Sequence, residues 1–376
     1  MRSGRIAAAV AGVAAVAFAV WLLPQGHETP PYVFAMPRAK VLWPLDPSSP
    51  EQARRRTLHQ ARVMTDRGAT PADLATNPPD PGGTLSGDPV RCRYLDGAAR
   101  GTTAKFDCVL RDGEVVKVKY GGTGEIQAEV AATRLLTALG FGADRMYLVP
   151  RLRCYGCLRT PFYTNWVLDK VRARQRVASA IGADAYTDFE WTAVERHFDA
   201  IPIEAGAHQG WAWFELEPMD ASLGANRAER DALNLMAMLL AHWDNKASNQ
   251  RLVCVAASVP PDAAPCPLPF AIVNDLGATF GPNKMDLESW RASPIWVDRA
   301  RCTVSMKAFP YSGSTFPDTG ISEEGRQLIA RMLTSLSDDQ VMSLFAGARF
   351  PGDIRRWTAA FRDKVRQIAE GAPCPL

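Results

Sequence analysis

The sequence lacks a large net charge, because 43 Lys and Arg residues stand against 40 Asp and Glu residues. A nucleic-acid-binding surface usually carries a basic excess, so this balance argues against a nucleic-acid partner. Histidine is scarce as well, at five residues, and no G-x-S-x-G motif is present. The sequence therefore gives no support to the Ser-His-Asp chemistry of the α/β-hydrolases.

The rest of the composition is that of a folded protein of 376 residues. Hydrophobic residues make up 47% of the chain and charged residues 22%, which excludes wholesale disorder. A chain of this length is able to bury one large core or two moderate ones. The 28 prolines are concentrated in a few stretches, which we interpret as linkers and loops.

The first residues predict export. Arg2 and Arg5 precede an uncharged run from Ile6 to Leu23 that is nearly long enough, as a helix, to cross a bilayer. Residues 1–24 are thus a cleaved signal peptide or an uncleaved anchor, and the bulky residues after the cleavage-like Ala17-Phe18-Ala19 favour the anchor. Positive charge before the run stays in the cytoplasm, so the remaining chain is expected to be periplasmic or secreted, with the membrane as a partner if the run is uncleaved.

Eight cysteines agree with export, since disulfides form in oxidising compartments. An even number permits complete pairing, but the spacing does not specify the partners. Cys154 and Cys157 form a C-x-x-C pair. A structural disulfide is favoured there over a redox pair or a metal site, because zinc needs two more ligands at suitable spacing.

Proline-rich segments organise the first quarter of the chain. Residues 25–89 predict a semi-rigid spacer that contains one polar helix from Glu51 to Arg67. Sequence typical of β-strands begins at about Val90, where we expect the compact domain to start. Short strands are predicted over residues 91–95, 105–110 and 114–119, and the last two are joined by the hairpin turn Arg111-Asp112-Gly113.

Helical periodicity dominates the remaining sequence. A helix is predicted from Glu125 to Leu139, ending at Gly140, and a long apolar helix from Arg227 to His242. The further predicted elements are strands at 252–254 and 270–274 and helices at 323–336, 338–346 and 354–369.

The segment that ends the long apolar helix has the spacing H-x-D-x-K-x-x-N. Its residues are His242, Asp244, Lys246 and Asn249, and Asp275-Leu276-Gly277 follows the next two predicted strands. Asp and Asn also cap helices and turns. Capping, however, requires neither the histidine and lysine nor the later aspartate, so these residues are candidates for a functional site.

The predicted strands upstream offer groups for nucleotide phosphates. The turn between the first two strands holds Gly97, Gly101, Thr102 and Thr103, whose backbone N–H groups and hydroxyls suit phosphate oxygens. Lys117 and Lys119 face the same way on the third strand, so both are candidates, with Lys119 preferred. The helix that follows offers Glu129, or alternatively Glu125, as the partner of this lysine.

In the order glycine loop, strand lysine, helix glutamate, catalytic loop and metal aspartate, the chain from about Val90 resembles the protein-kinase-like superfamily. The resemblance implies an α+β fold with two lobes, a small β-rich N-lobe at 90–218 and a mostly helical C-lobe at 219–376. It also implies transfer of the γ-phosphoryl group of ATP to a hydroxyl acceptor, with Mg²⁺ or Mn²⁺.

The resemblance implies a role for each residue of the catalytic loop. Asp244 would orient or deprotonate the acceptor hydroxyl, and Lys246 would neutralise charge on the γ-phosphate. Asn249 and Asp275 would hold the metal ion, and His242 would be a structural member of the loop.

Nucleotide binding is implied for other residues. Lys119 would contact the α- and β-phosphates and pair with Glu129, and residues 97–103 would cover the nucleotide. The segment Gly210–Leu216, which contains Glu215, is expected to be a hinge strand whose backbone meets adenine. Its two tryptophans are alternatively simple core residues.

Departures from ordinary protein kinases leave the acceptor open. An insertion separates Asn249 from Asp275, and a Cys254–Cys266 disulfide would close it. No A-P-E signature follows Gly277. The outline is similar to atypical kinases of the secretory pathway, the spore coat and bacterial toxins, with a protein, a glycan or a small molecule as acceptor. The alternatives are a pseudokinase that serves as a nucleotide-binding scaffold and an AMP transferase of the same fold.

Overall fold

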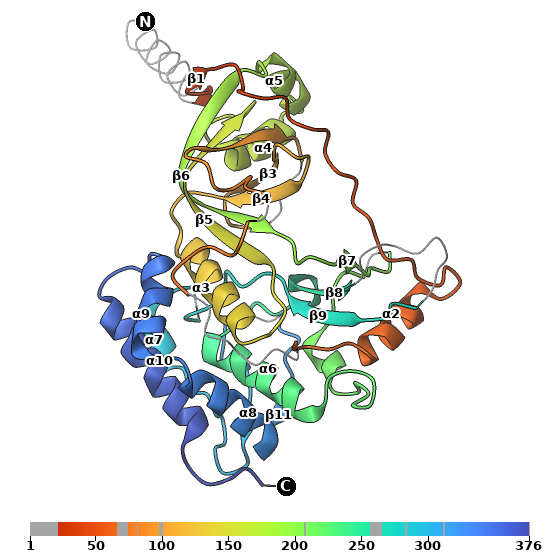
Figure 1. Ribbon diagram of the computed structural model, residues 1–376, viewed down its shortest axis with the longest axis vertical. Coiled ribbons are helices and arrows are strands. Elements are labelled where there is room, and N and C mark those ends of the chain that lie inside the picture. Colours follow the sequence, from red (N-terminus) through yellow and green to blue (C-terminus); the bar gives the residue numbers. More distant parts are fainter. Residues whose placement is uncertain are drawn as a thin grey trace, which may run out of the picture. The chain divides into compact units, whose positions relative to one another are not determined.

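The computed structural model describes residues 22–65, 74–80, 82–97, 101–206, 208–255, 265–282, 284–310 and 313–375. These residues form a mixed α+β structure (Figure 1). The chain divides into two compact units. The first comprises residues 1–39, 79–123 and 147–195, and the second comprises residues 40–78, 124–146 and 196–376. The predicted lobe boundary between Pro218 and Met219 stays a prediction.

The first unit is built on a six-stranded sheet of order β1-β6-β4-β3-β2-β5. Its strands are β1 (Gly26–His27), β2 (Val90–Leu95), β3 (Lys105–Val109), β4 (Val115–Lys119), β5 (Arg145–Tyr155) and β6 (Ala185–Arg196). The three strands predicted between residues 91 and 119 are confirmed as β2, β3 and β4, and neighbouring strands pair antiparallel. Strand β5 pairs with β2 in parallel and also with β6, so the sheet closes on itself. Two helices, α4 (Pro161–Lys170) and α5 (Arg174–Ala180), belong to the same unit.

Alternating side chains give the sheet its core. Val116 and Val118 of β4 are buried on one face, where Phe106 lies 5.0 Å from the ring centroid of Phe189. The turn before β4 requires Gly113, because its φ is +85° and an added Cβ would come 2.4 Å from the carbonyl oxygen of Met36. Side chains on the opposite face of β4 include the two candidate lysines.

The second unit contains most of the helices. They are α2 (Pro50–His59), α3 (Gly124–Ala138), α6 (Arg227–Leu240), α7 (Leu287–Ala292), α8 (Glu323–Thr334), α9 (Asp338–Gly347) and α10 (Ile354–Ala369), with the 3₁₀ turns η1 (Trp213–Leu216) and η2 (Ala247–Asn249). Its strands are β7 (Ile201–Pro202), β8 (Gln250–Cys254), β9 (Pro269–Val273), β10 (Thr303–Val304) and β11 (Thr319–Gly320). Helix α6 packs on α8, and α10 packs on α7, α8 and α9 (Figure 1).

Helix α6 is the element that positions the candidate catalytic loop. It begins with a capping box in which Asn226 Oδ1 accepts from Glu229 N–H at 3.0 Å and Glu229 Oε2 accepts from Asn226 N–H at 2.9 Å. Every residue from Asp231 to Leu240 is buried. The helix ends at Leu240, and the next residue, Ala241, has a φ of +54° that turns the chain sharply into the loop.

The packed part of the chain begins before Val90, whereas the proline content of residues 25–89 predicted a spacer there. Helix α2 ends at His59 and not at Arg67. After it, the chain extends along β9, with a bridge between Arg62 and Phe270. Leu58, Ala61 and Val63 are fully buried. Their apolar side chains stabilise this segment within the second unit, which local propensity does not reveal.

The prediction of a hinge strand at residues 210–216 is wrong. Residues 213–216 form the turn η1, because Glu215 N–H donates to Ala212 O at 2.8 Å and Glu215 Oε2 accepts from Ala212 N–H at 2.7 Å. Trp211 and Trp213 are buried, which confirms the alternative prediction that these tryptophans are core residues.

All eight cysteines form disulfides, which confirms structural pairing. The pairs are Cys92–Cys108, Cys154–Cys157, Cys254–Cys266 and Cys302–Cys374. The Cys254–Cys266 bond closes the insertion as expected. Four disulfides fit an oxidising compartment, whereas the location outside the cytoplasm stays a prediction.

The predicted signal or anchor falls almost wholly outside the described residues, which include only Leu22 and Leu23 of that run. Among the helices in the described part of the chain, none is long and apolar enough to cross a bilayer.

Candidate active site

The hairpin β8–β9 brings two distant stretches of sequence together in the second unit. Gln250 pairs with Val273, so the residues just before β8 lie beside those just after β9. The backbone carbonyl of Asn249 consequently accepts from Asn274 N–H at 2.9 Å and from Asp275 N–H at 3.0 Å. A backbone hydrogen bond therefore joins the two candidate metal ligands, Asn249 and Asp275, directly.

The catalytic loop folds back on itself through its own polar groups. Lys246 Nζ lies 2.9 Å from Asp244 Oδ1 and 3.0 Å from Oδ2. Asn249 Nδ2 donates to the carbonyl oxygen of Asp244 at 2.6 Å, which turns the amide oxygen of Asn249 away from this bond. The structure thus brings together Asp244, Lys246 and Asn249, which were predicted from their spacing, and Asp275, which was predicted from the strand that precedes it.

Asn245 anchors this loop and was missed from sequence. Its side chain is buried, and its Oδ1 accepts from Ser314 Oγ, Thr315 N–H and Phe316 N–H at 2.9, 2.8 and 3.1 Å. Thr315 Oγ1 also donates to the carbonyl oxygen of Asn245 at 2.6 Å. An asparagine between Asp244 and Lys246 carries no signal in a single sequence, because its partners lie about seventy positions away.

His242 is a buried neutral member of the loop. Burial lowers the pKa of its imidazole to about 4, although the carboxylates of Asp275 and Asp244 act in the opposite direction. Within the described residues, its Nδ1 has no hydrogen-bond partner. This environment suits a structural residue and not a proton donor at neutral pH.

Acid is expected to destabilise the protein through His242. The unfolded chain takes up this proton near pH 6.5 and the folded chain only near pH 4, so between these values the unfolded state holds more protons. The free energy of unfolding should therefore fall by about 3 kcal/mol as pH drops through this window. Urea unfolding at the two ends of the window should show this loss in the wild type and not in His242→Gln. The matched variant His208→Gln, at an exposed histidine, should behave as the wild type; equal losses in all three would contradict the assignment.

Glu125 packs directly against the Asp275-Leu276-Gly277 segment. A Cβ on Gly277 would lie 2.3 Å from Glu125 Cγ, so only glycine fits there. The carboxylate of Glu125 pairs with Lys284 Nζ at 2.5 Å. Glu125 is thus paired with a lysine of its own unit. Glu129, which was preferred as the partner of the strand lysine, is fully buried on the same helix, α3.

The candidate lysines of the first unit share a carboxylate that sequence reasoning missed. Glu195 of β6 lies opposite Lys117 and contacts its Nζ at 2.5 Å, and it lies 3.7 Å from Lys119 Nζ. Both lysines thus face the same way, as alternation along the strand predicts. The side chain of Lys119 is 1% exposed and that of Lys117 28% exposed. A lysine as buried as Lys119 needs such a carboxylate to remain charged.

The glycine-containing turn belongs to the first unit, and residues 98–100 within it lie outside the described residues. Gly97 is half-buried and Gly101 is exposed with a φ of +94°. Thr102 is exposed, and the buried Thr103 Oγ1 has no hydrogen-bond partner within the described residues. Glu129 belongs to the second unit, so its pairing with Lys119 stays a prediction.

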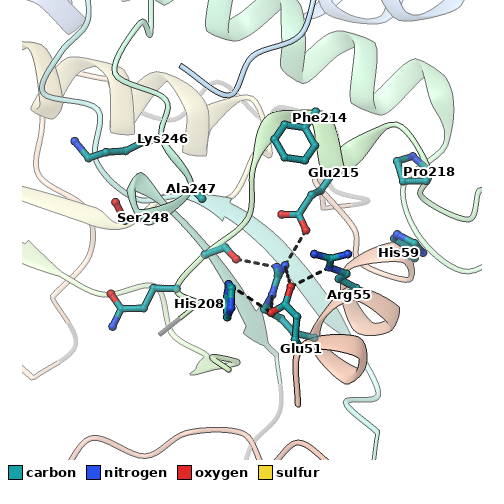
Figure 2. Close-up of a pocket in the computed structure, with 13 residues that line it drawn as sticks. Glu51, Arg55, His59, His208, Phe214, Glu215, Pro218, Lys246, Ala247 and Ser248 are labelled. Carbon is teal, nitrogen blue, oxygen red and sulfur yellow. Dashed lines mark hydrogen bonds and ion pairs between the residues drawn. The ribbon is translucent and has the colours of Figure 1, made fainter. Parts of the chain in front are cut away.

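A cavity of about 720 Å³ adjoins the catalytic loop in the second unit (Figure 2). Lys246, Ala247 and Ser248 form part of its wall, and helix α2 with residues 208–218 forms the rest. Its volume is that of an ordinary small-molecule site.

An ion-pair cluster braces this cavity. Arg54 Nη2 contacts Glu215 Oε1 at 2.7 Å and Glu51 Oε1 at 3.0 Å, and Nη1 donates to Gly210 O at 3.0 Å (Figure 2). Hydrogen bonds from Arg54 lower the pKa of Glu51 to about 2. Glu215, expected near the nucleotide, therefore lies in the cavity wall and is paired with Arg54.

Comparison with known proteins gives a similarity in structure but none in sequence. No family model and no curated protein matches the sequence. The chain is similar to the solved structure of the Helicobacter pylori proinflammatory kinase CtkA, with 10% identity and a TM-score of 0.40 over 70% of this chain and 92% of that chain. The case for a function therefore rests on the residues of this chain.

Proposed function

We propose that this chain is an atypical kinase with a two-lobed kinase-like fold, which transfers the γ-phosphoryl group of ATP to a hydroxyl acceptor. The observation that carries the proposal is the cluster of Asp244, Lys246, Asn249 and Asp275 between the end of a buried helix and a hairpin. A structural turn needs neither the lysine nor the second aspartate, whereas phosphoryl transfer uses all four groups.

The loop residues supply the chemistry of transfer. Asp244 accepts the proton of the acceptor hydroxyl while the acceptor oxygen bonds to the γ-phosphorus and the bond to the β-phosphate oxygen breaks, releasing ADP. Lys246, held against Asp244, offsets charge on the transferred group.

A divalent cation would be held by oxygen ligands of Asn249 and Asp275. The Asn249 amide nitrogen is used by the Asp244 carbonyl, so the amide oxygen is the atom left for a ligand, and Mg²⁺ or Mn²⁺ prefers oxygen. When bound, the ion neutralises phosphate charge.

Nucleotide contacts are assigned to the first unit. Lys119 would contact the α- and β-phosphates, and backbone groups of residues 97–103 would cover them, with Gly97, Gly101, Thr102 and Thr103 as the candidates. The pairing of Lys119 with Glu129 belongs to the proposal, and Glu195 is a further carboxylate beside this lysine.

The acceptor hydroxyl reaches Asp244 from the cavity of Figure 2, in this proposal. The support is that Lys246, whose Nζ contacts both oxygens of Asp244, is among the residues that line the cavity. Asp244 itself is not a lining residue, and in Figure 2 the Lys246 side chain extends away from Glu51, His208 and Glu215. A small molecule, or one residue of a glycan or protein, fits its volume.

Export, with residues 6–23 as signal or anchor, completes the proposal. Its support is the uncharged run itself and the presence of four disulfides, which form in oxidising compartments.

Asp275→Asn is expected to remove metal-dependent nucleotide binding. ATP with Mg²⁺ should stabilise the wild type by about 3 kcal/mol at about 100 times its dissociation constant, because only the folded state binds. Thermal unfolding with ATP, with and without Mg²⁺, measures this effect. The variant should lose the Mg²⁺-dependent part of the shift, and Asp339→Asn, at an exposed position on α9, should keep it. Full phosphoryl transfer by Asp275→Asn would contradict the metal assignment.

The mass of the modified acceptor separates the alternatives. Addition of phosphate supports the kinase, addition of AMP supports the transferase, and nucleotide binding without any transfer supports a scaffold.

A further inference from the structure

Helix α4 of the first unit (Figure 1) carries several large apolar side chains that are exposed to solvent. Tyr163, Trp166 and Val167 are 56, 64 and 50% exposed, and Val171, just after the helix, is 65% exposed. Spacings of three and four residues place the first three on one helical face. We call these four residues the α4 patch. A group of large exposed apolar side chains in one place usually marks an interaction site.

Cations border the α4 patch. Residues 159–176 contain five Arg or Lys residues and one acidic residue, Asp169, and Arg174 pairs both with Asp169 and with Asp96. Lys170 Nζ lies 4.8 Å from the ring centroid of Trp166. Lys170, Arg172 and Arg176 are exposed, and none of them pairs with a carboxylate in the described part of the chain. The surface beside the patch is therefore positively charged.

The end of the uncharged N-terminal run is fixed next to this helix. The carbonyl oxygen of Leu22 accepts from Arg159 N–H at 3.2 Å, and that of Leu23 accepts from Arg159 Nε at 3.1 Å. Arg159 stands two positions before the first residue of α4. Leu22 and Leu23, the last residues of the uncharged run, are thus hydrogen-bonded to the segment that carries the patch.

We propose that the α4 patch lies in the interfacial region of a lipid bilayer that contains anionic headgroups. Tryptophan and tyrosine prefer this region because one end of each ring system is polar and the other apolar. The valines would enter the acyl boundary, and Lys170, Arg172 and Arg176 would meet lipid phosphates. This contact goes beyond the proposed kinase activity and does not depend on it. It holds the first unit at the surface in addition to any tether through the N-terminal run.

Trp166 provides a local probe in the full-length chain. The protein is reconstituted into vesicles of phosphatidylcholine alone, or with about 30% phosphatidylglycerol. Each vesicle contains phosphatidylcholine brominated near the headgroup, which quenches nearby tryptophans. The chain has ten tryptophans, so the emission of Trp166 is taken as the difference between the wild type and Trp166→Phe.

We expect the quenching of Trp166 fluorescence to be at least about twofold stronger in the anionic vesicles than in phosphatidylcholine vesicles. High salt should weaken the quenching in the anionic vesicles. Lys170→Glu combined with Arg176→Glu should remove most of this difference, because two attractive charges become repulsive. The matched control Arg301→Glu, at another exposed arginine, should leave it unchanged. Circular dichroism and thermal unfolding check that each variant is folded.

Two other occupants of the patch give different results. If Trp166 is unquenched in both vesicles while the chain floats with them, the bilayer proposal is overturned. If Trp166 is shielded from aqueous acrylamide without any vesicle, a second copy or the first 21 residues cover the patch. A dimer in sedimentation that Trp166→Glu dissociates identifies the second copy, and Val297→Glu, at an equally exposed valine, serves as its control.

Discussion

Replacing Asp244 by asparagine is expected to lower the rate of phosphoryl transfer by about 10³-fold, which is typical when a general base is lost. The asparagine has the same shape and keeps one oxygen for Lys246 Nζ, but it cannot take the acceptor's proton. The fold should be unaffected, because the neighbouring bond from Asn249 Nδ2 goes to the backbone carbonyl of residue 244 and not to its side chain. Intact-mass analysis of acceptor and product over time measures the rate.

The matched control for this prediction is Asp339→Asn, which removes one carboxylate from an exposed turn of α9. It should transfer phosphate at the wild-type rate. Nucleotide binding by Asp244→Asn should persist, since the proposal assigns binding to other groups. A wild-type transfer rate in Asp244→Asn would rule out the catalytic role of this residue even if the chain is a kinase.

Removing the Cys302–Cys374 disulfide is expected to lower the free energy of unfolding by about 4 kcal/mol. The bond joins positions 72 residues apart, and cross-linking such a long loop strongly restricts the unfolded chain. It also ties the end of the chain, after α10, to the segment beside β10. Denaturant unfolding of the double variant Cys302→Ser, Cys374→Ser measures the loss.

The Cys254–Cys266 bond provides an internal comparison for this prediction. It closes a separation of only 12 residues, so its removal should cost about 3 kcal/mol in the same treatment. A smaller loss at Cys302–Cys374 than at Cys254–Cys266 would show that loop length does not govern the stabilisation. Reduction of the wild type should cost more than either pair alone.

The candidate catalytic residues were predictable because their signal is local. Asp244, Lys246 and Asn249 stand at fixed spacing within one loop, directly after an apolar stretch whose helical period is plain. Asp275 was found because a short strand leads into it. The structure adds the reason for their proximity, which is the register of the hairpin β8–β9.

Strands β5 and β6 were not predicted, and Glu195 was missed with them. Strand β5 contains Pro150 and three arginines, which hide the alternation of apolar residues. Strand β6 includes Trp191 at a φ of +49°, which interrupts regular strand geometry in its middle. Both strands are stabilised by pairing with β2 and β4, and such pairing over long distances leaves no local pattern.

The error at residues 210–216 has a similar origin. Aromatic residues at alternate positions are typical of a strand. Here, however, Trp211 and Trp213 are both buried in the core, while the side chain of Glu215 closes the backbone into a turn and pairs with Arg54 of α2. Arg54 lies about 160 positions away from Glu215, so no local property of the sequence predicts the contact between them.

The contact of Glu125 with Gly277 places the first turn of α3 directly against the segment that carries Asp275, the proposed metal ligand. Asp275 cannot move toward α3 unless the first turn of that helix retreats or the Glu125–Lys284 pair separates. If Asp275 holds the cation as proposed, a displacement of the first turn of α3 would therefore change the affinity for the cation. By thermodynamic reciprocity, binding of the cation would favour the position of α3 at which that affinity is higher.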